Sequence, residues 1–362
     1  MKNRAGIFPG NEEERTNMRA VVKFKREDGN TEVRDVPVPE IGPSDVLVKV
    51  AYIGICGSDP HMFHNQVSYP MAVPIILGHE FSGTIEKIGA DVKNWKPGDR
   101  VTAETHARFC GKCVLCKTNN YRFCRERKGY GFGVDGAFAE FVSVPERILH
   151  AVPDSVTLKD ASCTEPVCVA YNVVIAKAGV KAGDCVAVLG PGPIGILCVH
   201  MAKTAGASHI VVFGAPGDEK RLEIAQEYGA TETYVLDGTT DPKTAAAKFN
   251  EGYGFDKVID AAGPAATLKI SMDIVMPGGI INKVAWGPKP VDMSLDPLLS
   301  KGVTLQGSFS HTWDIWEKVL VMMGKGQMPL DALITHELPL EQWHEGFELI
   351  ESRKGLKVVL KP

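Results

Sequence analysis

A glycine-rich segment, GPGPIG at residues 190–195, constrains the fold of this 362-residue chain more than any other feature. It directly follows the apolar stretch CVAVL and opens the stretch PIGILCVHMAKTAG, whose pattern predicts a helix. A second apolar stretch of strand length, HIVVF, comes next. Strand, glycine-rich turn, helix and strand in this order predict a unit that binds a dinucleotide, with an ordinary glycine-rich turn as the alternative.

The glycines of this segment have separate predicted tasks. Gly190 permits the tight turn, Gly192 lets the backbone approach a pyrophosphate, and Gly195 lets helix and strand pack closely. The helix that begins with Pro193 and Ile194 then presents free N–H groups and its positive dipole end to phosphates. We therefore predict that these five residues contact the cofactor.

The end of the second strand bears on the choice between NAD and NADP. The strand ends in Gly214, where an acidic residue would bind an adenosine ribose with both hydroxyls free. Without that carboxylate a 2'-phosphate is not repelled, but no arginine directly follows to attract one. Asp218, Lys220 and Arg221 lie nearby and fit either cofactor. We predict cofactor contacts at Gly214 and Arg221, with NAD or NADP bound.

The length of the chain predicts two domains. From 18 to about 165, short runs rich in Val and Ile between turns indicate a mostly β part, preceded by a loose polar extension over 1–17. From about 181 to 306, apolar strands alternate with helices, which predicts a parallel sheet covered on both faces. The end of the chain predicts two helices, WDIWEKVLVMM and QWHEGFELIES, and a strand, LKVVLKP, which could pack back onto the first part.

Four of the nine cysteines lie in one short cluster with the spacing C-x2-C-x2-C-x7-C, formed by Cys110, Cys113, Cys116 and Cys124. Four thiolates so close in sequence predict a closed tetrahedral zinc site, which would stabilise a lobe with little apolar core. Free or redox-active cysteines are the alternative.

A second set of metal-ligand residue types is spread along the chain: Cys56 in GICGSDPH, His79 and Glu80 in LGHEFSG, and Glu165 in CTEPVC. Three protein ligands with one open position would make a catalytic zinc site. Each residue also has an ordinary alternative, such as a buried cysteine, a hydrogen-bonded turn histidine or a solvated carboxylate.

The motifs GICGSDPH, GHEFSGTIEKIG, WKPGDRV, the four-cysteine lobe, EPVCVAYNVV and GPGPIG occur in an order that resembles the medium-chain zinc alcohol and polyol dehydrogenases. The resemblance runs from about Met18 to the carboxyl terminus. It implies an α/β two-domain fold with a GroES-like β domain over 18–165 and 307–362, a zinc lobe at about 108–126, and a Rossmann doubly wound parallel sheet over 166–306.

The same resemblance implies the roles of the spread residues. Cys56 and His79 would bind the catalytic zinc, with Glu80 as a ligand or close neighbour. Glu165 would be the fourth ligand or a partner through water, and a Glu at this place is similar to sorbitol dehydrogenases. Two zinc ions per subunit, one catalytic and one structural, are therefore expected.

Ser58 matches the hydroxyl of the family's proton relay, Asp59 a carboxylate behind the ligand histidine, and His61 the outlet of the relay to solvent. Sorbitol dehydrogenases have an aromatic residue after the relay histidine and an Arg that touches the polyol. Here the apparent equivalents are Met62 and Ser308, which departs from that pattern and leaves the exact substrate open.

The resemblance predicts a zinc-dependent oxidoreductase that transfers a hydride from a secondary alcohol, expected on a polyol, to a nicotinamide cofactor. Zinc would lower the pKa of the substrate hydroxyl, and Ser58 and His61 would carry the proton away. Other secondary alcohols, such as threonine, a butanediol or a sugar acid, are alternatives. A non-catalytic dinucleotide-binding protein is a further alternative.

Composition narrows the partners. The chain is 44% hydrophobic and 23% charged with a formal net charge of -4, which excludes a disordered chain and argues against a nucleic-acid partner. We therefore interpret the basic residues of the cysteine lobe, Arg122, Arg125, Arg127 and Lys128, as a solvated face. No apolar run is long enough for a bilayer or resembles a signal peptide, so we expect no membrane partner and a cytoplasmic protein. The resemblance implies a homotetramer or homodimer.

Overall fold

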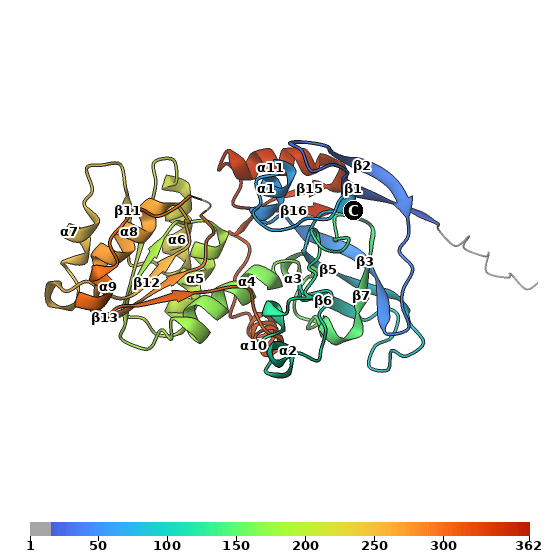
Figure 1. The fold of residues 1–362 in the computed structure, drawn as a ribbon, viewed down its shortest axis with the longest axis horizontal. Helices are drawn as coiled ribbons and strands as arrows, with labels where there is room; N and C mark the ends of the chain where they lie inside the picture. The colour runs from blue at the N-terminus through green and yellow to red at the C-terminus, as the bar shows by residue number, and fades with distance from the viewer. Residues whose placement is uncertain (1–15, 288) are drawn as a thin grey trace, which may run out of the picture.

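The computed structural model describes residues 16–287 and 289–362, and the predicted extension over 1–17 falls almost entirely outside them. The chain forms two lobes that lie side by side, with the carboxyl terminus in the same lobe as the first strands (Figure 1). Helix α4 (Thr164–Tyr171) lies where the two lobes meet.

One lobe contains a six-stranded, all-parallel sheet in the order β11-β10-β9-β12-β13-β14. This order is that of a doubly wound dinucleotide-binding sheet, so the predicted sheet is confirmed. Its strands are β9 (Cys185–Leu189), β10 (His209–Gly214), β11 (Glu232–Val235), β12 (Phe255–Asp260), β13 (Val275–Lys283) and β14 (Thr304–Gly307). Its helices are α5 (Pro193–Thr204), α6 (Glu219–Tyr228), α7 (Pro242–Ala246), α8 (Ala265–Ile274) and α9 (Asp296–Ser300), with a 3-10 turn at Asn250–Gly252.

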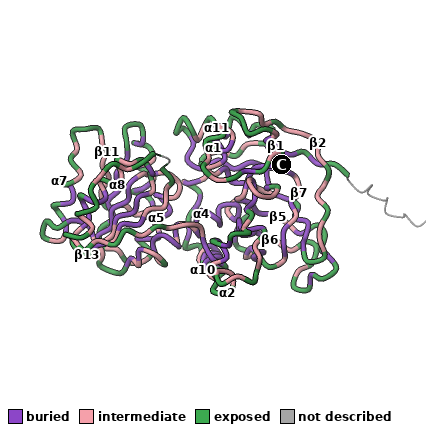
Figure 2. The backbone as a smooth tube through the Cα atoms, viewed as in Figure 1, coloured by how far each residue is buried: buried purple, intermediate pink, exposed green. Residues whose placement is uncertain are grey.

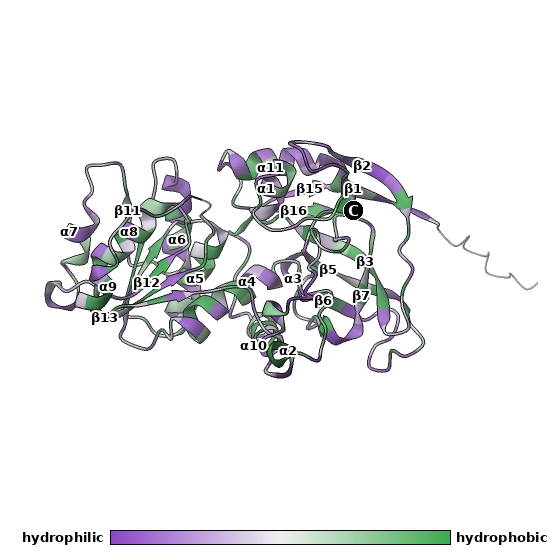
Figure 3. Ribbon diagram, viewed as in Figure 1, coloured by the Kyte–Doolittle hydropathy of each residue, from purple (hydrophilic) through white to green (hydrophobic). Residues whose placement is uncertain are grey.

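Both faces of this sheet are covered. Every residue of β9 is buried. Val186 and Val188 pack with α4, α5 and α6 on one face. Ala187 and Leu189, which point the other way, pack with α7 and α8. Figure 3 shows the resulting concentration of apolar residues along the central strands. The continuous apolar strands therefore reflect burial on two faces.

The other lobe is mostly β, as predicted. Its main sheet runs β15-β16-β3-β5-β6-β8 with β7 paired to β3, and a smaller sheet runs β2-β1-β4. The strands are β1 (Asn17–Lys23), β2 (Thr31–Pro37), β3 (Asp45–Gly54), β4 (Ile75–Ile76), β5 (Glu80–Ile88), β6 (Arg100–Ala103), β7 (Phe141–Pro145), β8 (Leu149–Ala151), β15 (Ile334–Pro339) and β16 (Lys357–Lys361).

The end of the chain returns to this lobe, which confirms the expected packing. Strand β16 pairs antiparallel with β3, bringing Val359 opposite Gly54. Helix α10 instead joins the core shared with α4 and α5 through Trp316. The remaining helical segments are α1 (Ser58–Phe63), α2 (Val114–Lys117), α3 (Leu158–Ala161), α10 (Trp313–Gly324) and α11 (Trp343–Glu351), a π-helical segment at Asn172–Lys177, and 3-10 turns at Tyr121–Phe123, Glu146–Ile148 and Leu340–Gln342.

Burial follows the two sheets. Figure 2 shows buried backbone through the centre of both lobes, with exposed residues in the outer loops. Among the helices of the described residues, none has the length and apolar character needed to span a bilayer.

Candidate functional site

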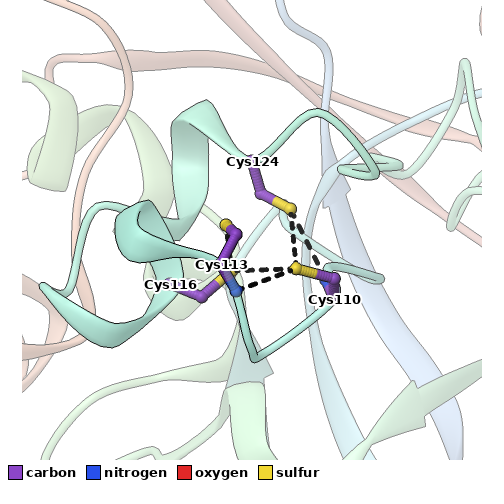
Figure 4. A group of neighbouring side chains, drawn as sticks. All are labelled: Cys110, Cys113, Cys116 and Cys124. Carbon is purple, nitrogen blue, oxygen red and sulfur yellow. Dashed lines mark hydrogen bonds between the residues drawn. The ribbon is translucent and has the colours of Figure 1, made fainter.

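The four clustered cysteines converge on one point (Figure 4). The Sγ atoms of Cys110 and Cys116 are 3.8 Å apart, those of Cys113 and Cys116 3.5 Å, and those of Cys110 and Cys124 3.6 Å. A tetrahedron with zinc–sulfur bonds of about 2.3 Å has edges of about 3.8 Å. The donor set therefore fits a closed zinc site, and none of these cysteines forms a disulfide.

The lobe around these cysteines has little core of its own. Val114 is 71% exposed and Phe123 48% exposed. Backbone N–H groups of Lys112 and Cys113 lower the pKa of Cys110 to about 6, which favours the thiolate that a metal binds. A metal would thus replace the apolar packing that this segment lacks.

The pairing of β3 with β5 brings Cys56, His79 and Glu80 together. Gly54 at the end of β3 lies opposite Glu80 at the start of β5, so the residues just beyond each strand end become neighbours. One potential ligand atom from each of the three residues lies within 4.8 Å of the others. A thiolate, an imidazole and a carboxylate are zinc donors, so this group also fits the metal.

Lys357 contacts this group through Glu80. Its ammonium donates to a carboxylate oxygen of Glu80 and, at 2.9 Å, to the carbonyl of Ile55. Both charged side chains are buried. A Cβ at Gly54 would lie 2.4 Å from the Glu80 carboxylate and 3.0 Å from Cε of Lys357, so only glycine leaves room for this pair.

Asp59 lies behind His79. Its Oδ2 accepts from the backbone N–H of Cys56 at 2.8 Å, and its Oδ1, which has no hydrogen-bond partner, lies 3.7 Å from Nδ1 of His79. Burial raises the pKa of Asp59 to about 6. Burial disfavours a charged His79, but Cys56 and Asp59 raise the pKa of this imidazole to about 10. The negative surroundings that attract a proton would equally attract a metal cation.

Glu165, at the start of α4, lies outside the 4.8 Å group of Cys56, His79 and Glu80. Its Oε1 is 3.3 Å from Nε2 of His311. Although burial opposes it, His311 lowers the pKa of Glu165. Nδ1 of His311 accepts from Nε1 of Trp316 at 2.7 Å, so the proton of a neutral imidazole lies on Nε2 and faces the carboxylate.

A third group of possible metal ligands consists of Glu104, His106 and His311, all buried. Most of their donor atoms already have hydrogen-bond partners. Tyr121 donates to Glu104 at 2.6 Å, and Nδ1 and Nε2 of His106 contact Nε of Arg127 at 2.7 Å and the Ser310 hydroxyl at 3.0 Å. This group is therefore a hydrogen-bond network beside Glu165.

The predicted relay residues share the short helix α1. Ser58 begins the helix and is partly buried, and His61 is exposed one turn later. Residues three apart lie on one helix face, so the helix leads from the Cys56 side to solvent. Met62 is buried, and the hydroxyl of Ser308 accepts from Asn172 at 3.2 Å.

The glycine-rich turn needs glycine at Gly190 and Gly195 for its backbone shape and its close packing. Gly190 has φ +96°, and a Cβ there would lie 2.8 Å from that of Ala262. A Cβ at Gly195 would lie 1.9 Å from the Gly190 carbonyl oxygen. Gly192 caps α5 and faces open space, and the first bond within the helix comes from Ile196. The N–H groups of the first turn, after Pro193, are thus free for a phosphate.

The loop after Gly214 is closed by charged contacts. Oδ2 of Asp218 accepts from the N–H of Ala215 at 2.9 Å, and Oδ1 is 3.7 Å from the Arg353 guanidinium. Arg221 donates to the Gly355 carbonyl at 2.8 Å. The carboxylate of Asp218 thus faces the Arg353 guanidinium, while Arg221 is bound to the backbone of Gly355.

Sequence reasoning missed Lys357, His311, His106 and Glu104. None belongs to a recognised motif, and the four residues reach the site from three separate segments of the chain. The only signal was their residue type, since ETHA and SFSH place titratable side chains in short connecting segments.

Two known domain families match the chain. Residues 42–154 match the alcohol dehydrogenase GroES-like domain, and residues 193–325 match the zinc-binding dehydrogenase domain.

Whole-chain relatives agree with these domains. The sorbitol dehydrogenase of Halalkalibacterium halodurans is 35% identical over 95% of this chain and 99% of its own length, and the D-arabitol-phosphate dehydrogenase of Enterococcus avium is 34% identical over 90% and 92%. The L-threonine 3-dehydrogenase of Bacillus velezensis is 34% identical over 95% and 99%. A solved zinc-binding dehydrogenase from Sinorhizobium meliloti bound to NADP superposes with a TM-score of 0.89 at 31% identity, covering 96% of this chain and 100% of the other.

Proposed function

The chain belongs to the zinc-dependent medium-chain alcohol dehydrogenases, and from this premise we propose that it oxidises a secondary hydroxyl of a sugar alcohol or other polyol. Hydride passes from the alcohol carbon to NAD or NADP in this reaction. The observation that carries the proposal is the meeting of Cys56, His79 and Glu80 at the strand ends. Relatives named for sorbitol and D-arabitol phosphate support a polyol.

We also propose the division of labour along the chain. Residues 18–165 and 307–362 form the catalytic domain, with the structural zinc lobe at about 108–126, and 166–306 bind the cofactor. Cys56, His79 and Glu80 would hold the catalytic zinc, with Glu165 as a partner through water. Gly190, Gly192, Gly195, Gly214 and Arg221 would contact the cofactor.

When bound, zinc would supply a Lewis acid that lowers the pKa of the alcohol hydroxyl toward neutrality. Ser58 then accepts the hydroxyl proton on Oγ and passes its own to the imidazole of His61, which is exposed and releases it to water. Asp59, whose Oδ1 lies 3.7 Å from Nδ1 of His79, would orient this imidazole for the metal. Glu165 is held by His311, whose Nε2 lies 3.3 Å from its carboxylate.

A homo-oligomer in the cytoplasm fits the same proposal. Strand β14 is an edge of the six-stranded sheet. Leu305 on this strand is 40% exposed, and Leu295 and Leu299 in the preceding segment are 60% and 84% exposed. An exposed apolar edge favours contact with a second copy. Light scattering would distinguish a dimer or tetramer from a monomer.

The test is turnover of a panel of sugar alcohols and simple secondary alcohols with NAD and NADP supplied separately, before and after a chelator removes the labile zinc. Threonine, 2,3-butanediol and sugar acids belong in the panel, because relatives include threonine dehydrogenases. We expect polyol oxidation that chelation abolishes and added zinc restores. A preference for threonine or butanediol would refute the polyol, and zinc-insensitive turnover would refute the metal role.

A further inference from the structure

Arg127 lies three residues beyond the last cysteine of the lobe, within the basic run expected to be solvated. The structure places it differently, because its side chain is partly buried. Its Nε donates to Nδ1 of His106 at 2.7 Å. Its guanidinium carbon lies 5.3 Å from the ring centroids of both Phe132 and Phe309. Two rings and one hydrogen bond therefore fix its position.

The charge of Arg127 forms no ion pair within the part of the chain that the structure describes. Among the described residues no carboxylate lies within 4.0 Å of its guanidinium, whereas buried Lys357 pairs with Glu80 and partly buried Lys283 with Asp260. Burial lowers the pKa of Arg127 to about 10, although Glu165 and Tyr69 act to raise it. Burying a cation without a paired anion costs free energy, and an anion bound from outside would offset that cost.

The guanidinium lies beside the reaction site. The ring centroid of Tyr69 lies 5.2 Å from that of Phe132. Burial raises the pKa of Tyr69 most, Asp59 and Cys56 raise it further, and Arg127 lowers it. On the other side, His106 contacts Ser310, and the next residue, His311, faces Glu165 at 3.3 Å. Arg127 is thus linked through His106 to the segment of Ser310 and His311, which faces Glu165.

We propose that Arg127 binds an anionic group, a carboxylate or a phosphate, carried by the alcohol substrate. A guanidinium offers paired N–H donors in one plane, which match two oxygens of either group. With Nε used by His106 and the plane fixed by the two rings, the terminal NH1 and NH2 groups remain for such a ligand. The inference rests on the proposed oxidation of a polyol and narrows it to charged polyols.

The test compares matched substrates on the zinc-loaded enzyme: D-sorbitol as the neutral alcohol, D-sorbitol 6-phosphate for the phosphate and D-gluconate for the carboxylate. Arg127→Met removes the charge, and Arg127→Lys keeps the charge but lacks the paired N–H donors of a guanidinium. Arg125→Met is the matched control, since Arg125 is exposed in the same run. We expect the favoured anionic substrate to exceed sorbitol in kcat/KM by about a hundredfold in the wild type. Arg127→Met should remove that preference while changing the sorbitol value less than threefold, Arg127→Lys should retain about a tenth of it, and Arg125→Met should retain it fully.

Two results would overturn the inference. One is an equal kcat/KM for the neutral and anionic alcohols in the wild type. The other is an equal loss of kcat/KM for both in Arg127→Met, which is expected if Arg127 only stabilises the contact between the lobe and His106. Binding of the same compounds is measured by calorimetry without cofactor, so the inference is tested even if turnover fails. Anion binding that Arg127→Met abolishes, with no alcohol oxidised, would leave the anion site standing and refute the proposed oxidation instead. Failure of all three compounds to bind would refute the anion site.

Discussion

The four-cysteine lobe has all its donors within residues 110–124. The Cys56 group, formed by Cys56, His79 and Glu80, lies at the ends of two paired strands and contacts Lys357, which is 277 residues beyond Glu80. The lobe is closed, since four thiolates fill a tetrahedron. The Cys56 group has three donors and contacts Asp59 and Lys357. A closed local group can stabilise the chain, and an open group assembled from distant segments can perform chemistry.

The largest effect should come from breaking the closed group. Cys113→Ser removes one of four thiolates, and apparent zinc binding energies of about 10–16 kcal/mol in zinc-finger peptides make a loss of at least about 3 kcal/mol in unfolding free energy reasonable. Urea unfolding and zinc content measure it. Cys185→Ser, outside both groups and beside the Ser208 hydroxyl, is the control. Unchanged stability with one zinc lost would mean that the lobe is not structural.

Breaking the open group should have the opposite effect, a loss of activity with little loss of stability. His79→Ala should lower kcat/KM by about a thousandfold, about 4 kcal/mol in transition-state stabilisation, with little change in unfolding. Steady-state kinetics and melting curves of the same preparation separate the two effects. His344→Ala, on an exposed face of α11, should change neither. A stability loss as large as that of Cys113→Ser would erase the distinction between the groups.

Lys357→Met tests whether the open group depends on the last strand. The substitution leaves the buried Glu80 carboxylate without its cation. Removing one partner of a buried ion pair lowers the free energy of unfolding by about 3–5 kcal/mol. Adding Glu80→Gln to Lys357→Met should recover part of that loss. Lys361→Met, at the exposed end of the same strand, should cost less than about 0.5 kcal/mol. Equal losses for the two lysines would show that the Glu80 pair adds no stability.

The same contrast explains what sequence could predict. The four-cysteine spacing and GPGPIG lie within short segments, and β9 over Cys185–Leu189 and α5 from Pro193 coincide with the predicted strand and helix start. Apolar periodicity also predicted the covered parallel sheet, because burial on two faces leaves a continuous apolar run.

Contacts between distant segments left no such pattern. Lys357 belongs to a strand whose apolar residues predicted only its return to the first lobe, and nothing local shows that its ammonium meets Glu80. Arg127 was interpreted as part of a solvated run because charge alone does not reveal the rings of Phe132 and Phe309 around it. Such contacts depend on strand register and chain return, which a single sequence does not encode locally.

The smallest effect should come from the point where the open group reaches solvent. His61 is exposed at the end of α1, so water can accept the proton from Ser58 when the imidazole is removed. We therefore expect His61→Ala to lower kcat by only about tenfold, less than the roughly hundredfold or larger effects usual for general acid–base groups, because water replaces the imidazole. Added imidazole should restore most of the activity in this variant and none in Ser58→Ala, whose hydroxyl is partly buried and contacts the reacting alcohol in the proposed relay. The closed lobe offers no comparable rescue, because zinc there would have four thiolates and no exchangeable proton. If imidazole rescued neither variant, the proton would leave by another route, and the open group would be linked to solvent elsewhere.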